Sequence, residues 1–180
     1  MGRLEDEILN SDVISIDTET TGTDWPRSRA FYLTLSTRWN DYGWDLRQEP
    51  KILGHLRGLI AKRPLVIAAH NASFDYKMCH SAGLVTPMEY WQCTVVRACL
   101  IDEHEGTIFP WTRKRGSYSL DDLGNKYLGE RKSLEFYERA REYFGKHKAT
   151  KNWIMARISQ LPVDIVDQYA KKDARLCLLI

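Results

Sequence analysis

The stretch Val13-Ile14-Ser15-Ile16-Asp17-Thr18-Glu19 places two acidic residues at the end of an apolar run. The run from Val13 to Asp17 predicts a buried central strand. Side chains two residues apart on a strand point to the same side, so Asp17 and Glu19 project together. Two carboxylates held close together resist joint ionisation, and a divalent cation with oxygen ligands removes that conflict. The stretch therefore indicates half of a metal site.

Two further segments carry residues that could complete the site. In the segment 69–75 a predicted strand ends near Ala69, and Asp75 falls in the first turn of the next predicted helix. Taken alone, Asp75 could equally serve to stabilise the helix dipole. In the last predicted helix, Tyr169 and Asp173 are four residues apart and share one helix face. By itself such a pair is typical of a surface or rim; the order of all three segments favours a shared site.

Hydrophobic periodicity predicts alternating strands and helices along the chain. The strands are expected at 13–17, 30–37, 42–46 and 65–69, with the second and third forming a hairpin. The helices are expected at 50–62, 73–82, 94–103, 119–128, 134–144 and from 162 to the end. Ser73 is the expected N-cap of the second helix and Gly83 its stop. The apolar side of the third helix is expected to carry Val95, Val96, Cys99 and Leu100.

Composition sets limits on function. The length of 180 residues fits one domain, and the net charge of +2 means that nucleic-acid binding would rest on local patches. No apolar stretch approaches the roughly 20 residues that span a bilayer. The first seven residues are too acidic and polar for a signal peptide, so a cytoplasmic location is expected. The cysteines lack C-x-x-C spacing and are expected to be buried free thiols, with a zinc site borrowing His80 or His104 as the less favoured alternative.

Two basic segments could contact nucleic acid. Basic grooves with aromatic platforms are typical of single-strand channels. The loop at 111–115 has that composition, and solvated charge is an equally good interpretation of it. The segment 131–153 is also basic, but its glutamates favour solvated surface charge. The residues concerned are Trp111, Arg113, Lys114, Arg115, Arg131, Lys132, Arg139, Arg141, Lys146, Lys148, Lys151 and Trp153.

The acidic motifs resemble those of the DEDD 3′–5′ exonuclease superfamily. Asp17-Thr18-Glu19-Thr20-Thr21-Gly22 is similar to the first motif, Asn71-Ala72-Ser73-Phe74-Asp75 to the second, and Tyr169-x-x-x-Asp173 to the third in its tyrosine form. The histidine form would need His at position 168, where this chain has Gln168. The resemblance spans nearly all of the chain from Val13 to Ile180.

Supporting phrases are similar to the proofreading domains of family A DNA polymerases, including phage enzymes. They are Ser119-Leu120-Asp121-Asp122-Leu123 and Tyr127-Leu128-Gly129. One departure is Cys93-Thr94, where many relatives have Asp-Thr at a position that is not a core ligand. The resemblance implies an α/β, ribonuclease H-like three-layer fold. Its central mixed sheet, with antiparallel hairpin strands and parallel strands, would be flanked by helices.

The resemblance also implies the site and its cations. Two divalent cations, Mg²⁺ or Mn²⁺, would be held by the four acids, and Tyr169 would orient the attacking water. Thr20 and Asn71 would contact the terminal nucleotide. Phe74 would either stack on a base or fill the core, with the core slightly favoured. The implied metal ligands are Asp17, Glu19, Asp75 and Asp173.

The implied function is hydrolysis at the 3′ end of single-stranded or frayed DNA, releasing nucleoside 5′-monophosphates during proofreading. Residues 1–180 would form one exonuclease domain cut from a longer polymerase chain, in a bacterial or phage-infected cell and without a membrane partner. A ribonuclease D-like, RNA-trimming exonuclease is the alternative. A catalytically silent nucleic-acid-binding domain is disfavoured, because such domains lose acids and this chain keeps all four.

Overall fold

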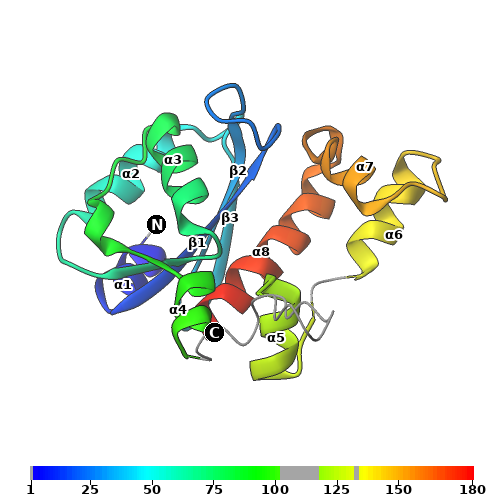
Figure 1. Ribbon diagram of the computed structural model, residues 1–180. Helices are drawn as coiled ribbons and strands as arrows, with labels where there is room; N and C mark the ends of the chain where they lie inside the picture. Colours follow the sequence, from blue (N-terminus) through cyan, green and yellow to red (C-terminus); the bar gives the residue numbers. More distant parts are fainter. Residues whose placement is uncertain (1, 102–117, 132–133) are drawn as a thin grey trace.

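The computed structural model describes residues 2–101, 118–131 and 134–180, and a five-stranded mixed sheet lies at its centre (Figure 1). The order across the sheet is β3-β2-β1-β4-β5. β1 pairs antiparallel with β2 and parallel with β4, while β2–β3 is antiparallel and β4–β5 parallel. This confirms the expected mixed sheet with its hairpin. The strands are β1 (Val13–Thr20), β2 (Ala30–Ser36), β3 (Asp41–Asp45), β4 (Val66–Ala69) and β5 (Trp91–Cys93).

Helices cover both faces of the sheet, which gives the expected three layers (Figure 1). On one face, α1, α2 and α3 pack against β1 and β2. On the other face lies the long helix α8, with α6 and α7 packed beside it. The helices are α1 (Gly2–Leu9), α2 (Lys51–Ile60), α3 (Ala72–Ala82), α4 (Thr94–Ile101), α5 (Leu120–Leu128), α6 (Leu134–Tyr143), α7 (Lys151–Met155) and α8 (Val163–Leu179), with short 3-10 turns at Met88–Tyr90 and Ile158–Gln160.

The alternation of β1 divides its side chains between the two faces. Ile14 and Ile16 are fully buried in the core beneath α1–α3. Ser15 points the other way, and its hydroxyl donates to the carbonyl of Ala174 on α8 at 2.6 Å. The Thr34 hydroxyl on β2 lies 3.3 Å from the carbonyl oxygen of Asp17 and 3.4 Å from that of Ala170, one helix turn earlier on α8. The Ser15 bond therefore links α8 to β1, and Thr34 contacts the preceding turn of the helix.

A glycine on β3 lets α8 approach closely. The Tyr32 hydroxyl on β2 donates to Asp167 Oδ1 on α8 at 2.6 Å. A Cβ atom at Gly43 would overlap both of these oxygens. Burial, followed by the hydrogen bond to Asp167, raises the pKa of Tyr32. The contact therefore holds a neutral phenol against a carboxylate, at a point where β3 has room for no side chain.

Two sequence-based expectations about helix ends and faces are wrong. The N-cap position of α3 is Asn71, not Ser73, and Asn71 adopts the left-handed conformation with φ 64°. Asparagine tolerates that conformation better than most residues. On α4 the predicted apolar side is only partly covered: Val95 and Cys99 are half-buried, whereas Val96 and Leu100 are 55% and 68% exposed. The small residues Thr94 and Ala98 face the protein instead.

Other boundaries agree with expectation. Gly83 ends α3 at φ 108°, and Ser119 caps α5 by accepting from the Asp122 N–H at 3.2 Å. The predicted loop at 111–115, together with His104 and Lys132, lies outside the described residues. Within the ranges described above, no helix is both long enough and apolar enough to cross a membrane.

Candidate active site

Two acidic side chains leave the same face of β1 near its end. The strand continues to Thr20, so Asp17 and Glu19 lie within it, beyond the end of the run Val13–Ile16. Asp17 is partly buried, and Glu19 is 7% exposed. They point to the side of the sheet to which Ser15 points, which is the side covered by α8. This places the strand acids opposite the last helix.

Helix α8 presents Tyr169 and Asp173 to these acids. Both are buried, with exposures of 5% and 3%. Burial raises the pKa of Tyr169 well above its usual value, and the negative charges of Asp173, Glu19 and Asp17 raise it further. Three of the four predicted acids therefore surround the phenol, which is held in its neutral form.

Aromatic side chains of α6 hold the Tyr169 ring. Phe136 stacks on it with ring centroids 4.2 Å apart and an interplanar angle of 26°. Tyr137 meets it edge-on at 6.4 Å. The sequence analysis considers the charged residues of this helix, and neither ring contact with Tyr169 is predicted from them. The signal was present, because Phe136, Tyr137 and Ala140 share one face at helical spacing.

Asp75 reaches β1 from the other side. The pairing of β1 with β4 ends at Ser15 and Ala68, so Thr18 has no strand partner on that edge. Asp75 Oδ1 accepts from the Thr18 N–H at 3.1 Å and from the Thr18 hydroxyl at 2.7 Å. Burial raises the pKa of Asp75 to about 7, although both hydrogen bonds from Thr18 lower it. The Asp75 carboxyl is therefore hydrogen-bonded to Thr18, which lies between Asp17 and Glu19 on β1.

The chemistry of these side chains suits a hard divalent cation. Carboxylate oxygens are the ligands that Mg²⁺ and Mn²⁺ prefer. Among the residues that the structure describes, however, no three His, Cys, Asp or Glu side chains are arranged to hold a metal ion. Asp75 is turned to Thr18 instead. The acids fit a cation in kind and in location, and binding would require their side chains to rotate.

The same finding gives no support to zinc in the described ranges. The four cysteines are free; Cys79 and Cys177 are buried, while Cys93 and Cys99 are partly exposed. His80 is exposed on α3. The expectation of free thiols is therefore confirmed, whereas the expectation that they are buried is wrong for Cys93 and Cys99.

The predicted substrate contacts lie at the ends of β1 and β4. The Thr20 hydroxyl donates to the carbonyl of Gly22 at 2.7 Å. Asn71 is exposed, and Phe74 is partly buried without joining any of the core clusters of described residues. His70 precedes Asn71 in the chain, and its Nδ1 lies 2.9 Å from the Thr94 hydroxyl on α4. Asn71 and Phe74 therefore remain accessible to a ligand.

A cavity of about 440 Å³ opens beside Glu19. Its volume is within the usual range of ligand sites. One wall is the end of β1 and the loop after it; the other is α7 and the turn that follows. The second wall was not predicted from the sequence, because a five-residue helix carries too few positions for a periodic signal. The lining residues are Glu19, Thr20, Gly22, Thr23, Asn152, Met155, Ala156 and Ile158.

Comparison with known sequences gives a consistent result. The profile of the 3′–5′ exonuclease family matches residues 1–180. DNA polymerase DpoZ of Vibrio phage phiVC8 is 40% identical over 174 residues, which cover 96% of this chain and 27% of that protein. DNA polymerase DpoZ of Salmonella phage PMBT28 is 32% identical over 172 residues, covering 94% and 25%. The chain therefore spans about a quarter of the length of these curated relatives.

Solved structures share the fold at low identity. Trypanosoma brucei RNase D, in complex with GMP, aligns with a TM-score of 0.67 and 14% identity, covering 99% of this chain and 52% of that one. The Aedes aegypti Nibbler EXO domain aligns with a TM-score of 0.61 and 15% identity, covering 99% and 79%. These likenesses concern the arrangement of sheet and helices.

Proposed function

The chain belongs to the 3′–5′ exonuclease family and has the ribonuclease H-like fold of exonuclease domains, and from this premise we propose that it trims the 3′ end of DNA. The substrate is single-stranded or frayed DNA, the products are nucleoside 5′-monophosphates, and the role is proofreading. The observation that carries the proposal is the group of carboxylates around Tyr169, beside an open cavity.

The choice of DNA rests on the curated relatives. They are DNA polymerases, with sequence identity across nearly the whole of this chain. Residues 1–180 then act as one exonuclease domain of a longer polymerase chain, in the cytoplasm of a bacterial or phage-infected cell. The alternative is RNA trimming. The RNase D-like neighbours share the fold with this chain, so they leave RNA trimming as an outcome of the test.

The side chains have distinct roles in this proposal. Asp17, Glu19, Asp75 and Asp173 would hold two Mg²⁺ or Mn²⁺ ions, with Asp75 taking part mainly through water. When bound, the ions supply Lewis-acid activation of water and stabilise the departing 3′ oxygen. The Tyr169 phenol stays protonated and positions the attacking water by a hydrogen bond, since a phenol with a raised pKa is a poor base.

The terminal nucleotide enters the cavity beside Glu19. Thr20 at the end of β1 and the Asn71 amide at the start of α3 contact it, and Phe74 is available to stack on its base. Asn152 and Met155 form the facing wall. Held between these walls, the terminal phosphodiester lies over the acids.

The proposal is tested with a 5′-labelled 12-nucleotide DNA and its RNA counterpart in the presence of Mg²⁺. We expect stepwise shortening of the DNA from its 3′ end. The rate should fall by at least about a thousandfold in Asp17→Ala and in Asp173→Ala, because each removes a metal ligand. Asp6→Ala, an exposed acid on α1, is the matched control and should keep full activity.

Each contrary result has a definite meaning. Full activity of Asp17→Ala or Asp173→Ala would rule out the proposed site. Faster shortening of RNA than of DNA would establish the RNA-trimming alternative. Tight binding without cleavage in Mg²⁺ or Mn²⁺ would mark a silent binding domain.

A further inference from the structure

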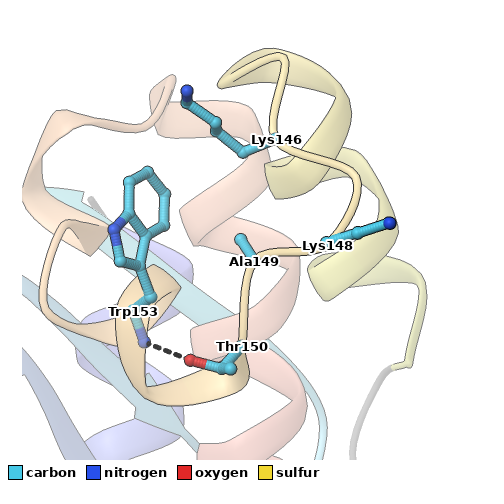
Figure 2. Close-up of a pocket in the computed structure, with 5 residues that line it drawn as sticks. All are labelled: Lys146, Lys148, Ala149, Thr150 and Trp153. Carbon is cyan, nitrogen blue, oxygen red and sulfur yellow. Dashed lines mark hydrogen bonds between the residues drawn. The ribbon is translucent and has the colours of Figure 1, made fainter.

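A second cavity, of about 390 Å³, lies between α6 and α7, apart from the acidic residues (Figure 2). The Trp153 indole forms one side of the cavity, and the Lys146 side chain lies near it. Lys148 points outward from the same loop, which connects α6 to α7. Ala149 and Thr150 complete the lining. The cavity therefore combines an aromatic wall with a basic rim.

The loop that forms this rim is held in place by its own backbone. The Lys146 N–H donates to the carbonyl of Arg141 at 2.9 Å, and the Ala149 N–H donates to the carbonyl of Lys146 at 2.9 Å. The Arg141 side chain donates from Nε to the carbonyl of Ala149 at 3.0 Å. Gly145, at φ 60°, allows the turn. The backbone that carries Lys146 and Lys148 is therefore held in one conformation by these hydrogen bonds.

The aromatic wall is also fixed. Phe144 meets the Trp153 ring edge-on, with centroids 5.3 Å apart. The Arg157 guanidinium lies 4.1 Å from the indole centroid, and the backbone N–H of Trp153 donates to the Thr150 hydroxyl at 3.2 Å, which caps α7. An indole held in this way would lose little conformational freedom when a planar ligand packs against it.

The charges on the rim have no anionic partner in the described part of the chain. Neither Lys146 nor Lys148 makes a side-chain hydrogen bond or ion pair there. Other basic residues of this region do: Arg139 contacts Asp164 at 2.6 Å. The positive charges of Lys146 and Lys148 are therefore available to bind an external anion such as a phosphate.

Helix α7 connects this cavity to the active site. Asn152 and Met155 line the cavity beside Glu19, whereas Trp153, between them in sequence, lines the second cavity. The two cavities lie on different sides of α7, and an α-helix with its side chains is roughly 10–12 Å across. That is about the rise of three stacked nucleotides. A strand whose 3′ end occupies the first cavity can therefore cross α7 and enter the second.

We propose that this second cavity is a subsite for an upstream nucleotide of the same DNA strand. The base packs against the Trp153 indole, and the flanking phosphates contact Lys146 and Lys148. This inference rests on the proposed exonuclease function and adds a binding position to it. It also replaces, for these lysines, the sequence-based preference for solvated surface charge.

The test measures binding of a 5′-labelled 12-nucleotide DNA by fluorescence anisotropy, with EDTA present and over a series of salt concentrations. In Trp153→Leu we expect Kd to rise about tenfold with an unchanged salt dependence, because base–aromatic stacking is lost. Trp153→Phe keeps a ring and should lose less. In Lys146→Gln/Lys148→Gln the slope of log Kd against log salt should fall by about 1.4, since two phosphate contacts are removed.

Matched controls separate the subsite from general effects. Trp39→Leu removes another half-exposed tryptophan with an arginine over its ring. Lys51→Gln/Arg57→Gln removes two exposed positive charges from α2. Both should bind as the wild type does. Wild-type Kd and slope in both cavity variants, or equal losses in the controls, would overturn the subsite.

Hydrolysis distinguishes this proposal from the one on which it rests. We expect the cavity variants to raise KM for the 12-nucleotide DNA and to leave hydrolysis of p-nitrophenyl thymidine 5′-phosphate, which has no upstream nucleotide, unchanged. If the wild type cleaves neither substrate, the exonuclease proposal fails, and the Kd values and salt slopes still decide whether the cavity binds DNA.

Discussion

At the scale of single residues, the bond between Thr18 and Asp75 decides the state of the site before a cation binds. The Thr18 side chain points away from its acidic neighbours on β1. By accepting from Thr18, Asp75 is kept on the α3 side of the strand. In the proposed metal-bound state, Asp75 would contribute to the site through water or by exchanging this pair of hydrogen bonds for direct ligation.

This arrangement predicts an unusual pH dependence for the metal-free protein. Burial raises the pKa of Asp75 to about 7 in the folded state, against an ordinary value of 3.8. The folded protein therefore takes up this proton before the unfolded chain does, so stability should rise as pH falls from 8 to 5. A tenfold difference in proton affinity between the folded and unfolded states corresponds to about 1.4 kcal/mol of stability.

The measurement is urea unfolding in EDTA at pH 8, 6 and 5. Asp75→Asn should lack this contribution and should be more stable than the wild type at pH 8, with the difference shrinking towards pH 5. Asp6→Asn serves as the exposed control. Parallel pH profiles for the wild type and Asp75→Asn would show that burial does not govern this carboxyl.

A variant of Tyr169 can distinguish two roles of its hydroxyl, which are positioning the attacking water and accepting a proton from it. Tyr169→Phe keeps the ring stacked on Phe136 and removes only the hydroxyl. We expect kcat to fall about a hundredfold, as for other single hydrogen-bond donors in active sites, with stability nearly unchanged. Because the phenol stays neutral, the pH–rate profile should keep its shape.

The check is steady-state kinetics from pH 6 to 9, with Tyr127→Phe as the control on α5. A rate that rises with pH in the wild type and is independent of pH in Tyr169→Phe would contradict the positional role and make the phenol a base.

At the scale of elements, β3 and α8 meet where β3 has no side chain. Gly43→Ala should break the Tyr32–Asp167 hydrogen bond between β2 and α8, because the new methyl group would overlap both of its oxygens. We expect a loss of about 1–3 kcal/mol in the free energy of unfolding. A fall in kcat should accompany it, since Tyr169 follows Asp167 by two residues.

Gly54→Ala is the matched control. Its Cβ would meet nothing within 4 Å on the exposed side of α2, so the change should stabilise the protein by about 0.5–1 kcal/mol. Chemical denaturation of both variants measures the two effects. The same sign in both would show that helix crowding at β3 does not matter.

The elements also show how far sequence alone can lead. The helices α2 and α8 were predictable, because each buries one face against a large core. The strands β1 and β2 were predictable from an apolar run and an alternating pattern, although both faces of each strand are buried. β5 and α7 were not, since three and five residues carry no usable period. The orientation of α4 was not predicted. The small residues Thr94 and Ala98 pack against the protein, whereas hydrophobicity alone predicts that larger apolar residues of the helix do so.

For the site, the order of the motifs was enough to nominate the four acids and Tyr169. The Phe136 stack and the bond from Thr18 to Asp75 depend on how distant segments meet. Asn71 illustrates the same limit, because its left-handed backbone is set by the connection between β4 and α3. Local preference alone pointed to Ser73.

At the scale of the whole molecule, cation binding should appear as added stability. A ligand that binds only the folded state stabilises it by about 2.7 kcal/mol at a concentration of 100 times Kd. We expect Mg²⁺ or Mn²⁺ to raise the Tm of the chelated protein, because bound cations relieve repulsion among buried carboxylates.

Differential scanning calorimetry with increasing cation concentration measures this shift. Asp17→Ala and Asp173→Ala should lose most of it, and Asp6→Ala should keep it. An equal rise in Tm in all four proteins would locate the cations elsewhere on the surface.

The hydroxyl bonds of Ser15 and Thr34 to successive turns of α8 have a consequence for ion selectivity. A slide of α8 along the sheet would break the Ser15 bond and the contact of Thr34 with Ala170. If the proposed site holds cations, we therefore expect ions of different radius to be accommodated by rotation of the carboxylate side chains rather than by movement of α8. Glu19 would adjust most, because its side chain is longer than those of the aspartates.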